Sequence, residues 1–245
     1  MRHAFATMGT VASIELPAEY AARLPELESV FAALEGRFSL HRVDSELSLI
    51  ASGALALTDS SDVMRASYAR ALDWRTATGS LFTPHRPDGA LDLNGIVKAE
   101  AIEKAGELLD SVGCTRWTIN VGGDILSRSD AEPWFVGLAD PAESGSLLCA
   151  VTLSGTRRAI ATSGSAQRGD HIWLGGQLRP AEFIQVSVMA DDIVTADVLA
   201  TAIVAGGPGA LDDIADRWPV DALTVARDGE IMATPGFRIA MRASA

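Results

Sequence analysis

Residues 92–105 read DLNGIVKAEAIEKA. From Ile96 to Val112 apolar residues recur every three or four positions, and Gly113 follows. This period predicts an amphipathic helix, and the glycine predicts where it ends. The residues expected on the inner face are Ile102, Ala105, Leu108 and Leu109.

The start of this helix has an unusual arrangement of charges. Asp92 precedes an Asn-Gly turn, and Lys98 lies in the first helical turn. A helix N-terminus binds anions through its free N–H groups, but its dipole disfavours a lysine there. Two interpretations are open: Lys98 serves a phosphate, or it is an exposed lysine on an ordinary capped helix.

Helices and strands are mixed on both sides of this helix without a strict βαβ order. Before it we expect a strand over 10–16, a helix over 18–37, a helical turn capped by Asp44 or Ser45, and a helix over 61–78 capped by Ser60 or Ser61. After it we expect strands over 116–121, 134–140, 147–153, 157–162, 171–175 and 183–190, helices over 196–205 and 209–217, and a hairpin turning at 227–230. The pattern predicts an α+β fold with mixed, largely antiparallel sheets and packed helices, in a single domain of residues 1–245.

The charge of the chain excludes some classes of partner. The formal net charge is −12, from 20 basic and 32 acidic residues. Nucleic acids and anionic membranes need a basic face, so neither is expected as a general partner. A small ligand with phosphates remains compatible, because a bound metal ion supplies positive charge locally.

Neither a membrane span nor an export signal is expected. No run approaches 18 uninterrupted apolar residues, and the first residues, MRHAFATMGT, lack an apolar core. A cytoplasmic protein is therefore expected. Cys114 and Cys149 lie in apolar stretches outside any CxxC or Cys/His cluster, which predicts two buried reduced thiols and no zinc site.

Two polar segments follow apolar strands. INVGGDI, residues 119–125, ends a strand in Gly-Gly-Asp, which allows close approach of a ligand but is also an ordinary turn. Thr162, Ser163 and Gly164 follow another strand, and their hydroxyl and N–H groups are candidates to hold phosphate or ribose oxygens. Beyond them, His171 is either a general base or a surface histidine at a strand end.

An acidic residue also lies in the apolar segment VTADVLATAIVAGG, residues 194–207. Asp197 and Thr201 are one helical turn apart, so their side chains share a face. Two hard oxygen ligands on one face suit Mg²⁺, which usually binds few protein ligands and completes its coordination with substrate phosphates. The alternative is that Asp197 is an N-terminal helix residue favoured by the dipole.

In their order along the chain, these segments resemble the FAD:protein FMN transferases, the ApbE-type flavin transferases. The matching stretches are MGT at 8–10, FSLHRVDSELS at 38–48, TGSLF at 78–82, DLNGIVKAEAIEKA at 92–105, INVGGDI at 119–125, ATSG at 161–164, HI at 171–172 and TADVLATAIVAGG at 195–207. The resemblance implies one ApbE-like, T-fold-like domain, with two subdomains meeting at a cleft for FAD and metal. A homo-oligomer is also compatible with the resemblance.

The family moves FMN from FAD to a threonine or serine of an acceptor protein and releases AMP, so the resemblance implies FAD as substrate, Mg²⁺ and an acceptor protein as partner. It implies metal ligands at Asp197, Thr201 and the Gly95 carbonyl, and catalytic roles for His171 as base and Lys98 near the phosphates. The residues expected at FAD are Met8, His41, Asp92, Lys98, Thr162, Ser163, Gly164 and Ile172.

Several positions depart from the family pattern. Only about ten residues separate Phe82 from Asp92, where the family has a long insertion that helps to cover the flavin. His41 replaces an aromatic residue, commonly tyrosine; Ala99 replaces a glycine; and the D-P-x-T-G run after His171 is missing. Two alternatives therefore stand beside transfer: hydrolysis of FAD to FMN and AMP, and FAD binding without catalysis.

Overall fold

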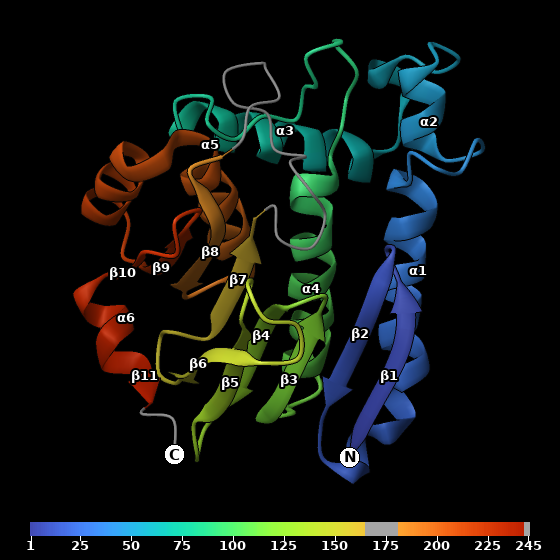
Figure 1. The fold of residues 1–245 in the computed structure, drawn as a ribbon. Coiled ribbons are helices and arrows are strands. Elements are labelled where there is room, and N and C mark those ends of the chain that lie inside the picture. Colours follow the sequence, from blue (N-terminus) through green and yellow to red (C-terminus); the bar gives the residue numbers. More distant parts are fainter. Residues whose placement is uncertain (165–180, 243–245) are drawn as a thin grey trace.

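The computed structural model describes residues 1–164 and 181–242. A layer of helices packs on one face of a large antiparallel sheet, and a small sheet packs on the other face (Figure 1). This arrangement confirms the predicted α+β fold with antiparallel sheets.

The large sheet has eight strands in the order β1-β2-β3-β4-β7-β8-β9-β10 within the described residues. Its strands are β1 (Arg2–Thr7), β2 (Thr10–Glu15), β3 (Arg116–Val121), β4 (Asp124–Ser129), β7 (Ala159–Ser163), β8 (Phe183–Ala190), β9 (Asp221–Ala226) and β10 (Ile231–Ala233). Every pairing described between these strands is antiparallel. The end of each strand therefore lies beside the start of its neighbour, which brings residues distant in sequence together, as at the end of β7 and the start of β8.

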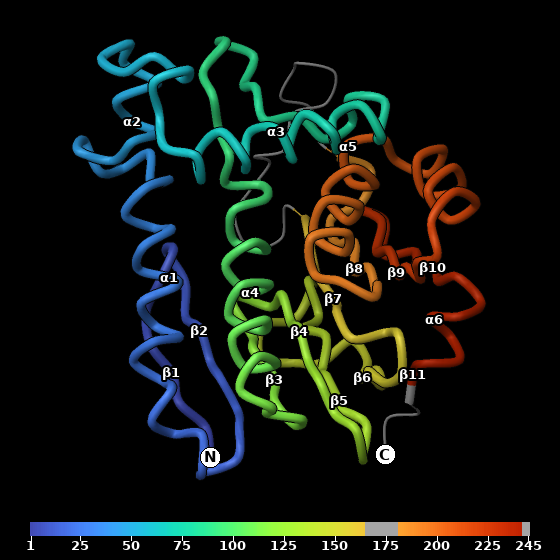
Figure 2. Tube along the Cα trace, turned by 180° about the vertical axis from the view of Figure 1, so that it is seen from behind, coloured from blue at the N-terminus to red at the C-terminus, as the bar shows by residue number. Residues whose placement is uncertain are grey.

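Three long helices cover one face of this sheet, as Figure 2 shows from behind. They are α1 (Leu24–Phe38), α4 (Asn94–Ser111) and α5 (Ile193–Arg217). α3 (Asp62–Ala77) crosses one end of this layer (Figure 1). The shorter helices are η1 (Ala18–Arg23), α2 (Glu46–Ala51), η2 (Leu57–Asp59) and α6 (Pro235–Ala240).

The second, smaller sheet has the order β11-β6-β5. Its strands are β5 (Trp134–Ala139), β6 (Leu147–Leu153) and β11 (Met241–Arg242). It buries Val136, Val151 and Leu153 against Ile160 and Leu223 of the large sheet. The large sheet is thus buried on both faces here, and the end of β5 lies near the end of β7 and the start of β8, where Gln185 Nε2 donates to Ala139 O at 3.2 Å.

Most expected elements are present, and the N-caps are the predicted serines. The Ser45 hydroxyl accepts a hydrogen bond from Ser48 N at 3.0 Å, and Ser61 accepts one from Met64 N at 3.2 Å. On the inner face of α4, Ile102, Ala105 and Leu109 are buried as predicted, whereas Leu108 is only half-buried. These features depend on local periodicity and on caps, which sequence determines directly.

Several expectations need correction. Three strands were not expected: β1, which pairs with β2, β4, which follows the Gly-Gly turn, and β11, which pairs with β6. The helices expected over 196–205 and 209–217 form one element, α5, with non-helical dihedral angles at Gly207, and it begins earlier because Asp192 caps it. Residues 18–23 form the 3₁₀ helix η1 before α1, not a continuous helix. The strand expected over 171–175 lies outside the described residues.

By length and composition α5 could cross a membrane, with a mean hydropathy of 1.5 over its most apolar stretch. However, 67% of that stretch is buried inside the domain. Its apolar residues do not form an uninterrupted run, because Asp197, Thr201 and glycines lie among them. Such burial is typical of the core helix of a globular domain.

Both cysteines are buried, as predicted. Burial raises the pKa of the Cys114 and Cys149 thiols above the ordinary value. Because the thiolate is the reactive form, neither cysteine is suited to nucleophilic chemistry.

Glu100 of α4 is a buried acid between α3 and α4. Its side chain is 4% exposed, accepts a hydrogen bond from Ser67 Oγ at 2.6 Å, and lies 3.8 Å from Arg70 Nη1. Burial raises the pKa of Glu100 above 4.5, and the Ser67 hydrogen bond and Arg70 oppose that shift. A raised native pKa means that the protonated form stabilises the fold, and this stability is lost as pH rises from the unfolded value through the native one.

Glu100→Gln is expected to remove that loss, because glutamine keeps a neutral side chain of the same size. The stability of the variant relative to wild type should therefore increase as pH rises above 4.5. Urea unfolding measured across this pH range checks the prediction. Glu107→Gln, on the exposed side of α4, is the control and should leave the pH profile unchanged. A Glu100→Gln profile parallel to that of wild type would contradict the prediction.

Candidate active site

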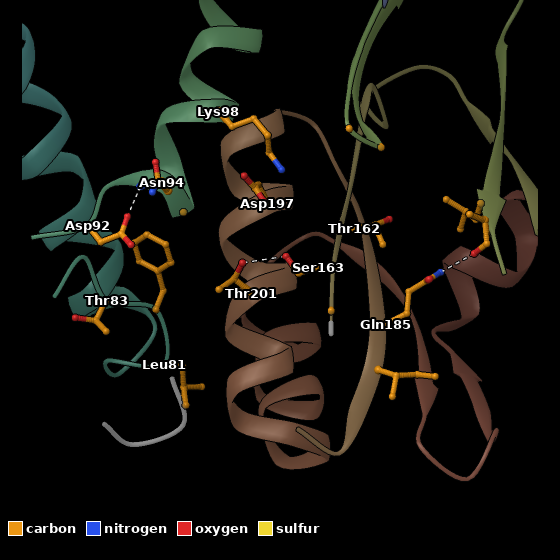
Figure 3. Close-up of a pocket in the computed structure, with 18 of the residues that line it drawn as sticks. Leu81, Thr83, Asp92, Asn94, Lys98, Thr162, Ser163, Gln185, Asp197 and Thr201 are labelled. Atoms are coloured by element: carbon orange, nitrogen blue, oxygen red, sulfur yellow. Dashed lines mark hydrogen bonds between the residues drawn. The ribbon is translucent and has the colours of Figure 1, made fainter. Parts of the chain in front are cut away.

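A cavity of about 320 Å³ lies where α4, α5, the end of β7, the start of β8 and the small sheet meet (Figure 3). This volume is in the range of small-molecule sites. Polar and charged side chains dominate the wall made by the helices, and β5 contributes small and apolar residues. The lining residues are Leu81, Phe82, Thr83, His85, Arg86, Asp92, Asn94, Gly95, Lys98, Gly122, Gly123, Gly137, Leu138, Ala139, Thr162, Ser163, Gly164, Ile184, Gln185, Asp197 and Thr201.

One wall carries the predicted oxygen ligands. Asp197 lies one turn inside α5 and is 4% exposed, and Thr201 follows one turn later. Gly95, in the first turn of α4, lines the same cavity. A carboxylate, a hydroxyl and a backbone carbonyl are hard oxygen donors, so these three residues fit a hard divalent cation such as Mg²⁺. Residues 1–164 and 181–242 contain no cluster of three or more His, Cys, Asp or Glu side chains placed to hold a metal ion.

Lys98 lies on the adjacent wall and forms an ion pair with Asp124, the first residue of β4. Asp124 is fully buried, and its Oδ1 also accepts a hydrogen bond from Thr162 N at 3.1 Å. In Figure 3 the Lys98 side chain extends from α4 toward the side of α5 that carries Asp197. The interpretation of Lys98 as an exposed surface lysine is therefore wrong, since its side chain is 17% exposed and paired.

The end of β7 forms a third polar wall. Ser163 Oγ and Thr201 Oγ1 are hydrogen-bonded at 3.0 Å, which joins this strand to α5 (Figure 3). Thr162 Oγ1 is hydrogen-bonded to Ser187 Oγ at 2.8 Å, and Thr162 N is taken by Asp124. The expectation that the N–H groups of this segment hold a ligand is thus wrong for Thr162.

Gly164, which ends this segment, lies against the backbone of β8. A Cβ added there would lie 2.1 Å from the carbonyl oxygen of Ile184 and 3.0 Å from the Cα of Gln185. Both atoms belong to the main chain of a central strand and cannot move aside like a flexible side chain. Only glycine fits this position, and its place in the cavity wall depends on that contact.

Gly164→Ala is therefore expected to destabilise the protein by about 1–3 kcal/mol, as overpacking does, and to distort the cavity wall. Thermal unfolding measures the first effect. The matched control is Gly36→Ala in α1, where an added Cβ meets nothing within 4 Å and alanine is expected to stabilise the helix slightly. A Gly164→Ala variant as stable as Gly36→Ala would show that the strand is not packed this closely.

The short connection before α4 supplies residues that sequence reasoning missed. Residues 84–92 form a small hairpin that places His85 and Arg86 in the cavity wall. The Tyr68 hydroxyl of α3 lies 3.2 Å from His85 Nε2 and ties the hairpin to the helical layer. The turn sequence Arg-Pro-Asp-Gly, residues 86–89, was the available signal, since it predicts a tight turn.

Four predicted site residues are not brought into this cavity by the described structure. Met8 lies in the β1–β2 turn with a φ of 48°, near the Gly122 turn, whose N–H donates to Val11 O at 3.2 Å. His41 is exposed, and its N–H donates to Ser39 Oγ. His171 and Ile172 lie outside the described residues. The roles expected for these four at FAD or in catalysis stay predictions.

Curated relatives of this chain are flavin transferases. It is 25% identical over 162 residues to the FAD:protein FMN transferase of Escherichia coli (strain K12), which covers 60% of this chain and 46% of that protein. The protein of the same description from Klebsiella pneumoniae (strain 342) is 25% identical over 169 residues, covering 62% of this chain and 48% of that protein. The chain thus spans about half the length of the curated relatives it matches.

Solved structures share the whole fold. The ApbE protein from Thermotoga maritima superposes with a TM-score of 0.83 at 18% identity, covering 99% of each chain. The flavin transferase ApbE from Vibrio cholerae has a TM-score of 0.79 at 19% identity, covering 98% of each chain. These similarities confirm the predicted ApbE-like fold.

The family model described as the ApbE family matches residues 84–224. That range begins at the hairpin, contains Lys98, Thr162 and Asp197, and ends in β9. Because the match covers more than half of the sequence and the fold agrees along the whole chain, this chain belongs to the ApbE family.

Proposed function

We propose that this chain is a Mg²⁺-dependent flavin transferase, which moves FMN from FAD to a threonine or serine hydroxyl of an acceptor protein and releases AMP. The observation that carries the proposal is that Asp197, Thr201, Gly95 and Lys98 line one cavity. These residues come from α4 and α5 and are about a hundred positions apart in sequence. The names of the curated relatives support the same reaction class.

In the proposed reaction the acceptor hydroxyl oxygen bonds to the phosphorus on the FMN side of the FAD diphosphate. The bond from that phosphorus to the bridging oxygen breaks, and AMP leaves with the electron pair. The hydroxyl proton passes to a base, for which His171 is the candidate. Bound Mg²⁺ would be held by Asp197, Thr201 and Gly95 and would neutralise charge on the phosphate oxygens.

The described residues contribute mainly position and charge. Asp197 is held by the rigid second turn of α5, and the Ser163–Thr201 hydrogen bond fixes the neighbouring strand end. Lys98 is held by Asp124, so its ammonium group has a defined place in the wall. Preorganised charges of this kind stabilise a transition state without reorganisation.

The test mixes the purified chain with FAD, Mg²⁺ and an acceptor domain of a flavinylated protein and follows covalent flavin by in-gel fluorescence, with AMP measured in parallel. A fluorescent acceptor band that EDTA abolishes is the expected result. AMP formed equally without acceptor would identify FAD hydrolysis instead. FAD binding with neither product, over a series of acceptors and metals, would identify a binding protein and refute the proposal.

A further inference from the structure

The hairpin of residues 84–92 holds its side chains in defined positions. Arg86 N donates to Ala90 O at 2.9 Å, Gly89 N donates to Arg86 O at 2.9 Å, and Asp92 N donates to Pro84 O at 2.8 Å. Gly89 has a φ of 83°, which glycine adopts without strain. The hairpin thus presents Arg86 to the cavity from a short, closed loop immediately before α4.

The charges around the cavity are unevenly balanced. Lys98 is compensated by the buried Asp124, and Asp92 and Asp197 add negative charge to the lining. Arg86 Nη2 forms an ion pair with Asp88 Oδ2 at 3.2 Å, and these side chains are 39% and 58% exposed. An ion pair so exposed to water is weak.

Arg86 also has unused capacity to donate. Its Nε is buried and has no hydrogen-bond partner among the residues that the structure describes. A buried N–H without a partner is unfavourable, and a ligand oxygen would satisfy it. Arginine suits phosphate particularly well, because its planar guanidinium donates two parallel hydrogen bonds to neighbouring oxygens.

We infer that Arg86 binds the diphosphate of the flavin nucleotide that enters this cavity. The inference rests on the proposed function and adds to it a residue outside the segments that resemble the family motifs. A diphosphate carries two negative charges into a wall that already holds Asp92 and Asp197. The proposed Mg²⁺ would offset Asp197 and part of the phosphate charge, Lys98 is paired with Asp124, and Asp92 adds further negative charge. Arg86 supplies the additional positive charge, from the short connection between α3 and α4.

Calorimetric titrations of FAD, ADP and riboflavin in the presence of Mg²⁺ test the inference on three variants. Arg86→Gln is expected to weaken FAD and ADP about ten- to hundredfold, the usual loss for a hydrogen bond to a charged group, and to leave any riboflavin affinity unchanged. Arg86→Lys should restore part of the affinity, because it keeps the charge but not the fork. Asp88→Asn removes the exposed partner of Arg86 and should bind FAD at least as tightly as wild type.

The outcomes separate this inference from the proposed function. If wild type binds FAD and Arg86→Gln binds it equally well, the inference is refuted and the proposed function stands. If wild type does not bind FAD but binds ADP in a manner that depends on Arg86, the proposed function fails and the phosphate contact stands. Equal losses of FAD affinity in Asp88→Asn and Arg86→Gln, or a parallel loss of riboflavin affinity, would show that Arg86 only holds the hairpin together, and would overturn the inference.

Discussion

Replacing Asp197 by asparagine is expected to reduce Mg²⁺-dependent FMN transfer by about a hundredfold or more, because a metal ion contributes several kcal/mol to such a reaction and each 1.4 kcal/mol changes the rate tenfold. Asp197 is the carboxylate among the three proposed metal ligands and is 4% exposed. Asparagine has the same shape but no charge, so the change removes the attraction for the cation and preserves the volume of the site.

Initial rates of flavinylation at increasing Mg²⁺ concentration measure this effect. The matched control is Asp191→Asn, just before α5, where the side chain is 57% exposed and pairs with Arg157. The control should keep wild-type rates, and circular dichroism should show that both variants are folded. Wild-type metal dependence in Asp197→Asn would refute the assignment of Asp197 as a ligand.

Lys98→Met is expected to destabilise the protein by about 3–5 kcal/mol, the usual cost of leaving one partner of a buried ion pair uncompensated. The carboxylate left behind, Asp124, is fully buried. The double variant Lys98→Met/Asp124→Asn should recover most of the stability, because the asparagine side-chain oxygen is neutral and still accepts the hydrogen bond from Thr162 N.

Denaturant unfolding of wild type, of the single variants Lys98→Met and Asp124→Asn, and of the double variant gives the coupling energy between the two side chains. Lys104→Met, at an exposed position of the same helix, is the control and should change stability by less than about 0.5 kcal/mol. If Lys98→Met is no less stable than this control, the ion pair does not support the fold. A folded but inactive double variant, together with an active Asp124→Asn single variant, would assign the lysine to the reaction as well as to stability.

The sequence alone was sufficient wherever the information is local. The period of apolar residues predicted α4. The capping hydroxyls of Ser45 and Ser61 predicted where α2 and α3 begin. Asp197 and Thr201 share a face because they are one helical turn apart, which needs no tertiary contact. The ordered motifs also predicted the family, and the whole fold agrees with it.

Tertiary structure alone decided which of these local features meet. Lys98 and Asp124 lie on a helix and a strand, and no periodicity predicts that the lysine finds a buried acid rather than solvent. The Thr162 N–H looked available in sequence, but Asp124 accepts it once β4 and β7 pair. Arg86 lies in the cavity wall because the turn of residues 86–89 folds the chain back just before α4. Such contacts join segments that are distant along the chain, and they form only when the sheet and the helical layer pack together, so local sequence patterns do not predict them.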